Sequence, residues 1–387
     1  MDINTVRDWK FNIAFDNSAY KEIVHHSFLY DTKERDILDF QIEFYRKNFT
    51  FEQLLKSFRI LKTKDEIDVF KSAVIKRRDN ILYIPSELKQ YYLDIINKDF
   101  KANSEFLKEM LNLACTKKCK KNPMLPIYKK MMGVYYAPVC KKLKKYARRK
   151  AIKPAVERAS SGSNYITTAK RIVRDLSSDD LTQGIWGKFT LSNIDIDYNT
   201  DPGRGIFLSK YFYSGSANSY IIQTSGNSIS SDDLRLSIYG NVYPGCGHLF
   251  SQIMYKRGFN FDCGADFIIN GWGTFAAWHV KNNQYTRYQK VLYSTITNLL
   301  ISGNWQDSLS KIYIYLLGHF SKEEAIRYLV MIVGYPGKFE SYVMGALATE
   351  QLIARKFATS PMGLLDEYKK RNVADFFALF KPNTNKC

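Results

Sequence analysis

The fold is best approached through one stretch near the middle of the chain, which reads Ser237-Ile238-Tyr239-Gly240-Asn241-Val242-Tyr243-Pro244-Gly245-Cys246-Gly247-His248-Leu249-Phe250. It begins like a helix, and Pro244-Gly245 interrupts that helix because proline lacks a backbone N–H and clashes with the preceding turn. A second stretch with the same rhythm follows: Asn270-Gly271-Trp272-Gly273-Thr274-Phe275-Ala276-Ala277-Trp278. We expect the two stretches to lie in successive helices, at about 232–257 and 262–285.

Apolar residues at helical spacing predict a mainly α-helical protein. The other predicted helical ranges are about 18–115 (several helices), 164–176, 287–302, 306–318, 321–334, 338–357 and 362–380. Between 187 and 224 the apolar period changes to two, as in Ile194 and Ile196, with Gly, Asp and Pro between the runs. This alternation predicts a small antiparallel β-sheet.

Composition divides the chain into three parts. Residues 1–116 form a helical N-terminal region, and residues 117–159 form a basic segment. The loop Ser160-Ser161-Gly162-Ser163 then opens the region 160–387, which contains both quoted stretches.

The totals favour a folded protein with polyanionic partners. The formal net charge is +19, and hydrophobic residues make up 45% of the 387 residues, enough for a sizeable core. No run reaches the roughly 18 apolar residues of a membrane span, and the polar start Met1–Thr5 does not resemble a secretory signal. Six cysteines in so long a chain predict reduced thiols and an intracellular location, in the cytoplasm or nucleus. The abundance of Lys, Asn, Ile, Tyr and Phe is typical of AT-rich genomes, including those of large DNA viruses.

The basic segment is the strongest feature of the charge pattern. Lys117 to Lys153 holds fourteen Lys or Arg and no Asp or Glu, with tyrosines between the bases. Its densest part predicts a site for nucleic acid, another polyanion or an acidic protein, formed by Lys141, Lys142, Lys144, Lys145, Arg148, Arg149 and Lys150. The alternatives are a nuclear localisation patch, a solvated helix face or a linker.

Three motifs in order resemble those of the helical gluzincin-like zinc peptidases. That family carries His-Glu-x-x-Pro-Gly-His-His, then Glu-Gly-Trp-Ala-Leu-Tyr-Ala-Glu, then Pro-Gly-Gln-x-x-Ser-Tyr-x-x-Gly. The corresponding stretches of this chain begin at Gly240, Asn270 and Pro336. The resemblance covers roughly residues 200 to 380 and implies a helical fold built around a substrate cleft, with Trp272, Ser341 and Tyr342 near that cleft.

The resemblance also implies that the zinc site is degenerate. The first family His corresponds to Gly240, and the general-base Glu to Asn241. The His after Pro-Gly corresponds to Cys246, and the next to Gly247, or to His248 if one residue is inserted. The third ligand, Glu, corresponds to Asn270. Such a site lacks the ligands that bring the pKa of a zinc-bound water near neutral, so we expect no metal, no cofactor and no catalytic residue of the family type.

The favoured hypothesis is therefore a catalytically inactive zinc-peptidase-like protein that acts as a binding or structural scaffold. Two alternatives remain open. The basic segment Lys117 to Lys153 predicts nucleic-acid or polyanion binding, which is compatible with the first hypothesis. The third hypothesis is a hydrolase with altered, non-zinc chemistry, in which Cys246 would be the reactive group.

Overall fold

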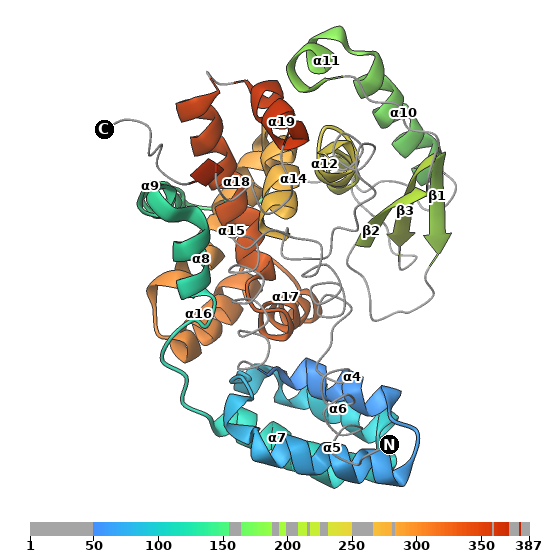
Figure 1. Ribbon diagram of the computed structural model, residues 1–387, viewed down its shortest axis with the longest axis vertical. Helices are drawn as coiled ribbons and strands as arrows, with labels where there is room; N and C mark the ends of the chain where they lie inside the picture. Colours follow the sequence, from blue (N-terminus) through green and yellow to red (C-terminus); the bar gives the residue numbers. More distant parts are fainter. Residues whose placement is uncertain are drawn as a thin grey trace. The chain divides into compact units, whose positions relative to one another are not determined.

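The computed structural model (Figure 1) divides the chain into two compact units. It describes residues 49–154, 164–187, 193–198, 208–214, 217–224, 231–249, 266–280, 283–357, 360–370 and 379–380. Unit 1 comprises Met1–Met131, Asn260–Gly264 and Leu299–Phe339, and unit 2 comprises Met132–Phe259, Ala265–Asn298 and Glu340–Cys387. This division differs from the one expected from composition. The basic segment is shared between the units, and residues 299–339 join the N-terminal helices.

The described residues of unit 1 form helices and the loops that connect them. Its helices are α4 (Phe51–Ile60), α5 (Lys64–Lys76), α6 (Lys89–Asp99), α7 (Ser104–Thr116), most of α8 (Leu125–Met132), α16 (Trp305–Leu317) and α17 (Lys322–Gly334), with 3₁₀ turns η1 (Arg78–Asn80), η2 (Ser86–Leu88) and η3 (Lys101–Asn103). The predicted helices before residue 49 lie outside the described residues. Those at 306–318 and 321–334 are confirmed.

Local sequence explains where several of these helices begin. Thr50, Thr63 and Ser321 are N-cap residues whose side chains accept hydrogen bonds from backbone N–H groups three residues on. In each case the residue at that third position, Gln or Glu, reaches back to the N-cap backbone and completes a capping box. These reciprocal bonds satisfy donors that a helix start would otherwise leave unpaired.

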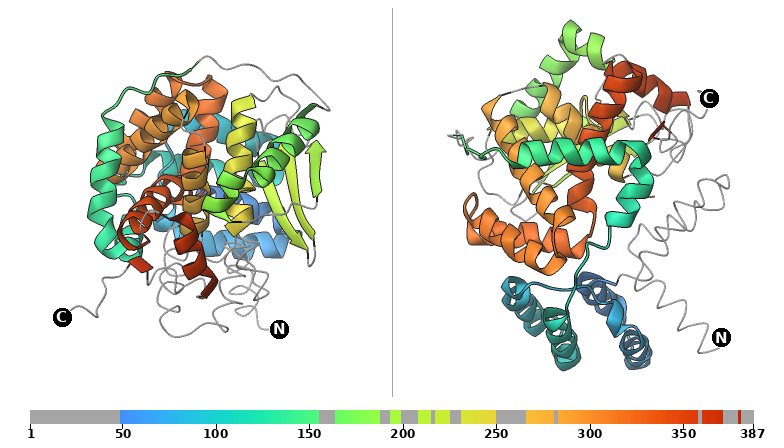
Figure 2. Two further views of the ribbon diagram at one scale, coloured as in Figure 1. Left: turned by 90° about the horizontal axis from the view of Figure 1, so that it is seen from above. Right: turned by 90° about the vertical axis from the view of Figure 1, so that its left-hand side faces the viewer.

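Unit 2 holds the two quoted stretches. Its elements include η4 (Gly133–Tyr135), α9 (Tyr136–Ala147), α10 (Asn164–Ser178), α11 (Asp180–Trp186), α12 (Ser231–Asn241), α14 (Asp266–Val280), most of α15 (Gln284–Ser302), most of α18 (Lys338–Lys356) and α19 (Pro361–Lys370). Figure 2 shows α10 beside the strands and α9 at the periphery of this unit. The prediction of a mainly helical protein is confirmed. The helix predicted at 232–257 ends at Asn241, just before the Pro-Gly pair.

The sheet is mixed, and the expectation of an antiparallel sheet is not confirmed. Its strands are β1 (Asn193–Tyr198), β2 (Leu208–Ser214) and β3 (Ala217–Thr224), in the order β1-β3-β2. β2 and β3 pair antiparallel as a hairpin, whereas β1 pairs in parallel with β3, with Ile194 opposite Tyr220. Alternation predicts strands, but strand direction depends on the connection between β1 and β2, which local periodicity does not reveal.

Among the helices of the described residues, none combines the length and apolar character that crossing a bilayer requires.

Candidate functional site

Glycines bring α12 and α14 into backbone contact. A β-carbon placed on Gly273 of α14 would stand 2.4 Å from the carbonyl oxygen of Gly240 in α12 and 2.5 Å from Sγ of Cys246. A β-carbon on Gly240 would stand 3.3 Å from the carbonyl oxygen of Gly273 and 3.6 Å from Cβ of Ala277. The space beside the position of the first family His is therefore filled by the backbone of the neighbouring helix.

A second pair of glycines joins α14 to α18. A β-carbon on Gly271 would lie 2.6 Å from Cα of Gly345, and a β-carbon on Gly345 would lie 2.7 Å from Cα of Gly271. Two helices can approach this closely only where both lack side chains. α14 thus contacts α12 through Gly273 and α18 through Gly271.

The turn after α12 is held by the tryptophan of the second motif. Pro244 follows a cis peptide bond, and its carbonyl oxygen accepts a 2.9 Å hydrogen bond from Nε1 of Trp272. A β-carbon on Gly245 would stand 1.9 Å from the carbonyl oxygen of Gly240, so the turn folds back onto the end of α12. The Pro-Gly pair and the tryptophan, which the sequence links only by motif order, are therefore in direct contact.

His248 is part of the core. Its side chain is fully buried, and Nε2 lies 2.7 Å from the carbonyl oxygen of Trp186. Burial lowers the pKa of His248 to about 4, although the hydrogen bond to Trp186 opposes this shift. A neutral imidazole that donates from Nε2 fits this contact. The Tyr243 hydroxyl donates to the carbonyl oxygen of Gly187 at 2.7 Å, so the two side chains together fix the chain at the end of α11.

The other residues predicted to line a degenerate site make hydrogen bonds within the protein. Asn241 Nδ2 donates to Ser237 Oγ at 3.2 Å, and Asn270 Nδ2 donates to Ser341 Oγ at 3.2 Å. The Cys246 thiol donates to the carbonyl oxygen of Ile269 at 3.2 Å.

These donors do not fit a zinc site of the family type. Such a site needs three anionic or imidazole ligands, whereas Gly240 offers no side chain and Asn270 offers a neutral amide. His248 directs Nε2 at a backbone carbonyl oxygen. Within the described ranges, no three His, Cys, Asp or Glu side chains cluster closely enough to hold a metal ion.

The predicted cleft residues differ in burial. Trp272 has no exposed surface and packs against the rings of Trp186, Phe275 and Tyr368. Ser341 is 3% exposed and pairs with Asn270, as described above. Core packing and the hydrogen bond to Pro244 explain why Trp272 is buried in this position. The assignment of Ser341 and the half-buried Tyr342 to a cleft stays a prediction.

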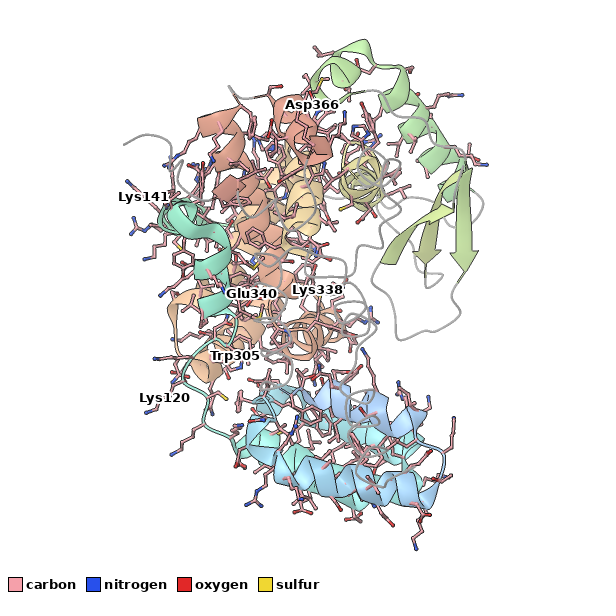
Figure 3. The ribbon with its side chains drawn as sticks, in the orientation of Figure 1. Lys120, Lys141, Trp305, Lys338, Glu340 and Asp366 are labelled. Carbon is pink, nitrogen blue, oxygen red and sulfur yellow. The ribbon has the colours of Figure 1, made fainter. Side chains whose placement is uncertain are left out.

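The basic segment forms a distinct surface on α9. Val139 and Leu143 are buried, whereas Lys141, Lys144, Lys145 and Arg148 are exposed at positions i, i+3, i+4 and i+7, which share one helix face. We call these four residues the α9 stripe. None of their side chains makes a hydrogen bond or ion pair to a described residue. Lys141 projects outward from α9 (Figure 3), and Arg149 and Lys150 extend the exposed basic surface beyond the helix.

Lys142 differs from the other predicted binding residues because it faces inward. Its Nζ lies 2.7 Å from Oε1 of Glu350 in α18, and each side chain is about one quarter exposed (23% and 24%). Burial alone would raise the pKa of Glu350, but the hydrogen bond from Lys142 and the charge of Lys290 hold it below its ordinary value. The positive charge of Lys142 is therefore already balanced by the carboxylate of Glu350.

Lys290 of α15 adds a second charge beneath α9. Its Nζ lies 4.8 Å from the ring centroid of Tyr146 and 5.1 Å from that of Trp278. Burial lowers the pKa of Lys290, and Glu350 opposes the shift. Sequence analysis missed Lys290 and Glu350, because both are lone charges on amphipathic helices and only the three-dimensional contact distinguishes them.

No protein-family model matches the chain, and no curated protein matches it. One solved structure that is similar to the chain is described as that of a "putative lipoprotein" from Colwellia psychrerythraea, with 10% sequence identity and a TM-score of 0.49. The match covers 86% of this chain and 69% of that chain. A similarity at this level carries no conclusion about function, so the resemblance to zinc peptidases stays a prediction.

Proposed function

We propose that the protein is a catalytically inactive relative of the helical gluzincin-like zinc peptidases that acts as a binding scaffold. One observation carries the proposal: where the family has ligands and a base, this chain has a glycine in backbone contact or side chains bonded within the protein, at Gly240, Asn241, Cys246, His248 and Asn270. Gly240 abuts Gly273, Asn270 bonds Ser341 and Cys246 bonds the backbone of Ile269. On this proposal the protein uses the contacts between α12, α14 and α18 as a scaffold and lacks the reactive groups of the family.

The test is the zinc content of the full-length protein, purified without chelator and measured by mass spectrometry. The proposal expects far less than one zinc per chain. A stoichiometric zinc that resists dialysis would overturn it. In that event Cys246→Ser and His248→Gln would show whether these two residues are among the ligands, with Cys119→Ser as the control for the loss of a thiol elsewhere.

A second function, compatible with the first, is polyanion binding by the α9 stripe. The observation that favours it is the exposure of three lysines on one face of α9, which contains no acid, together with Arg148 at its C-cap. Each exposed cation can release counterions from a polyanion, so binding should weaken steeply as salt rises.

Heparin provides a structure-independent test of polyanion binding. Retention on a heparin column should fall when all four stripe residues are changed to Gln. A matched variant with Lys64, Lys76, Lys98 and Arg78 changed to Gln loses the same charge from exposed sites in unit 1. Equal retention of the two variants would reject the stripe as the polyanion site.

A further inference from the structure

We infer that the α9 stripe binds the phosphate backbone of double-stranded nucleic acid, without sequence preference. This inference rests on the polyanion-binding function proposed above and specifies its partner. Three properties of the described surface lead to it: the spacing of the cations, the position of the tyrosines and the anchoring of the helix.

The spacing of the stripe matches a phosphate backbone. From Lys141 to Arg148 the helix advances seven residues, or about 10.5 Å at 1.5 Å per residue. One strand of a B-form duplex presents about four phosphates over that length of axis, since successive phosphates are about 3.4 Å apart. Four flexible cationic side chains on one face can therefore contact successive phosphates. Contacts to phosphates fix the position of a protein on a duplex but carry no sequence information directly, so binding of this kind has no sequence preference.

The position of the tyrosines argues against single strands. Proteins that bind single strands without sequence preference stack bases on exposed aromatic rings. In the described part of this surface, Tyr135 is buried against Phe380 and Arg355. Tyr146 is contacted by Lys290 on α15 and by Arg149. Tyr135 and the half-buried Tyr146 thus pack against other side chains of the protein, and the exposed residues of α9 include no aromatic ring.

The helix is anchored, so the backbone that carries the stripe is held in place before a ligand arrives. Val139 and Leu143 insert into the core, and Lys142 pairs with Glu350. Because Glu350 is engaged with inward-facing cations, it does not neutralise the stripe. A helix whose backbone is already fixed loses less conformational entropy on binding than a mobile basic tail does.

An anionic membrane is the less favoured partner. Membrane-surface helices combine cations with exposed large apolar side chains, whereas the exposed residues of α9 are Ala137, Lys141, Lys144 and Lys145. The exposed Val134 and Ile152 lie beyond the two ends of the helix. They do not form an apolar face on it.

Fluorescence anisotropy with the full-length protein tests the inference. The probes are a labelled duplex of mixed sequence, roughly 30 base pairs long, one of its single strands, and vesicles containing phosphatidylserine. We expect the duplex to bind more tightly than the single strand and a scrambled duplex to bind equally. With four phosphate contacts, duplex affinity should fall on the order of 100-fold between about 50 and 200 mM salt. The stripe variant should lose most of that salt dependence, and the unit 1 variant should keep it.

The possible failures can be told apart. Two outcomes would reject duplex nucleic acid as the partner while heparin retention still depends on the stripe. In the first, the single strand binds as tightly as the duplex; in the second, vesicles bind and the duplex does not. Polyanion binding by the stripe would stand in both cases. If the stripe and unit 1 variants behave alike on heparin and on the duplex, both proposals fail. Because the stripe side chains are exposed, both variants should unfold at the same temperature as the unmodified protein, and this is checked first.

Discussion

Gly273 lies so close to Gly240 that a β-carbon on Gly273 would stand 2.4 Å from the Gly240 carbonyl oxygen. The clash would be with backbone, which cannot rotate away as a side chain can. The contact joins the two motif-bearing helices, and Cys246 Sγ occupies the other side of the same position. One of the close backbone approaches of unit 2 therefore lies at the position predicted for the degenerate site.

Replacing Gly273 with Ala should destabilise the protein by about 1–3 kcal/mol, the usual cost of overpacking a core. In an exposed helix the same change would stabilise by up to about 1 kcal/mol. Gly184→Ala in α11 is the matched control, because a β-carbon there has nothing within 4 Å. Urea denaturation of the two variants measures the difference. A Gly273→Ala protein as stable as the unmodified one would show that α12 and α14 are not in contact through this residue.

Protonation of His248 should destabilise the fold in mild acid. The folded-state pKa is about 4 and the unfolded-state value about 6.5, so the unfolded chain binds more protons between these values. Stability is therefore complete above about pH 6.5 and falls as the pH drops toward 4, by roughly 3 kcal/mol at most. His248→Gln keeps an N–H donor for Trp186 but does not titrate in this range. The pH dependence of the free energy of unfolding should be shallower in this variant, and identical slopes would contradict the buried position of His248.

Much of the helical fold can be predicted from local sequence, and the reasons are visible in particular residues. Periodicity locates α16 to α18 within one or two residues, and capping boxes such as Ser321 with Glu324 fix where helices start. The pairing of β1 with β3 could not be predicted, since period-two alternation identifies strands but not their neighbours. The alignment of Gly240, Asn241 and Asn270 with the ligand and base positions of the peptidase family stays a prediction.

Sequence could not predict what those positions do instead, because their partners lie far away in the chain. His248 bonds Trp186 from 62 residues away, and Asn270 bonds Ser341 from 71 residues away. For the basic segment, composition predicted a cationic surface. Only the structure separates the exposed Lys141 from the paired Lys142 and assigns Tyr146 to the interior side of α9.

The Lys142–Glu350 pair should contribute measurably to stability because both groups are largely shielded from water. In a double-mutant cycle with Lys142→Met and Glu350→Gln, we expect a coupling energy of about 1 kcal/mol or more. Glu350→Gln alone should cost about 1–3 kcal/mol, since it leaves Lys142 and Lys290 without their shared counter-charge. The control cycle uses Lys108 and Glu105, whose side chains are 33% and 88% exposed, with an expected coupling below about 0.5 kcal/mol. Similar couplings in the two cycles would mean that Glu350 does not anchor α9.

The same pair predicts a second acid effect of defined sign. Because the folded-state pKa of Glu350 is lowered, its contribution is present above the unfolded-state pKa and is lost as the pH falls through the folded-state value. Glu350→Gln should therefore lose stability mainly above about pH 4.5, and its deficit relative to the unmodified protein should shrink in stronger acid. A deficit that stays constant down to low pH would indicate a packing effect rather than a charge effect.

Restoring the family residues should not restore a zinc site. A variant with Gly240→His, Asn241→Glu and Asn270→Glu supplies the missing imidazole and carboxylates. However, a side chain at position 240 would meet the Gly273 carbonyl oxygen at 3.3 Å and Ala277 Cβ at 3.6 Å from its first carbon. Changing Asn270 also breaks its bond to Ser341. We expect a destabilised protein with substoichiometric zinc by mass spectrometry, and Asn241→Glu alone, at a half-buried site, should be better tolerated. If the triple variant instead binds one zinc per chain and remains folded, the contact between α12 and α14 can open to admit ligands. In that case the residue types at positions 240, 241 and 270 alone would explain why the protein has no zinc site.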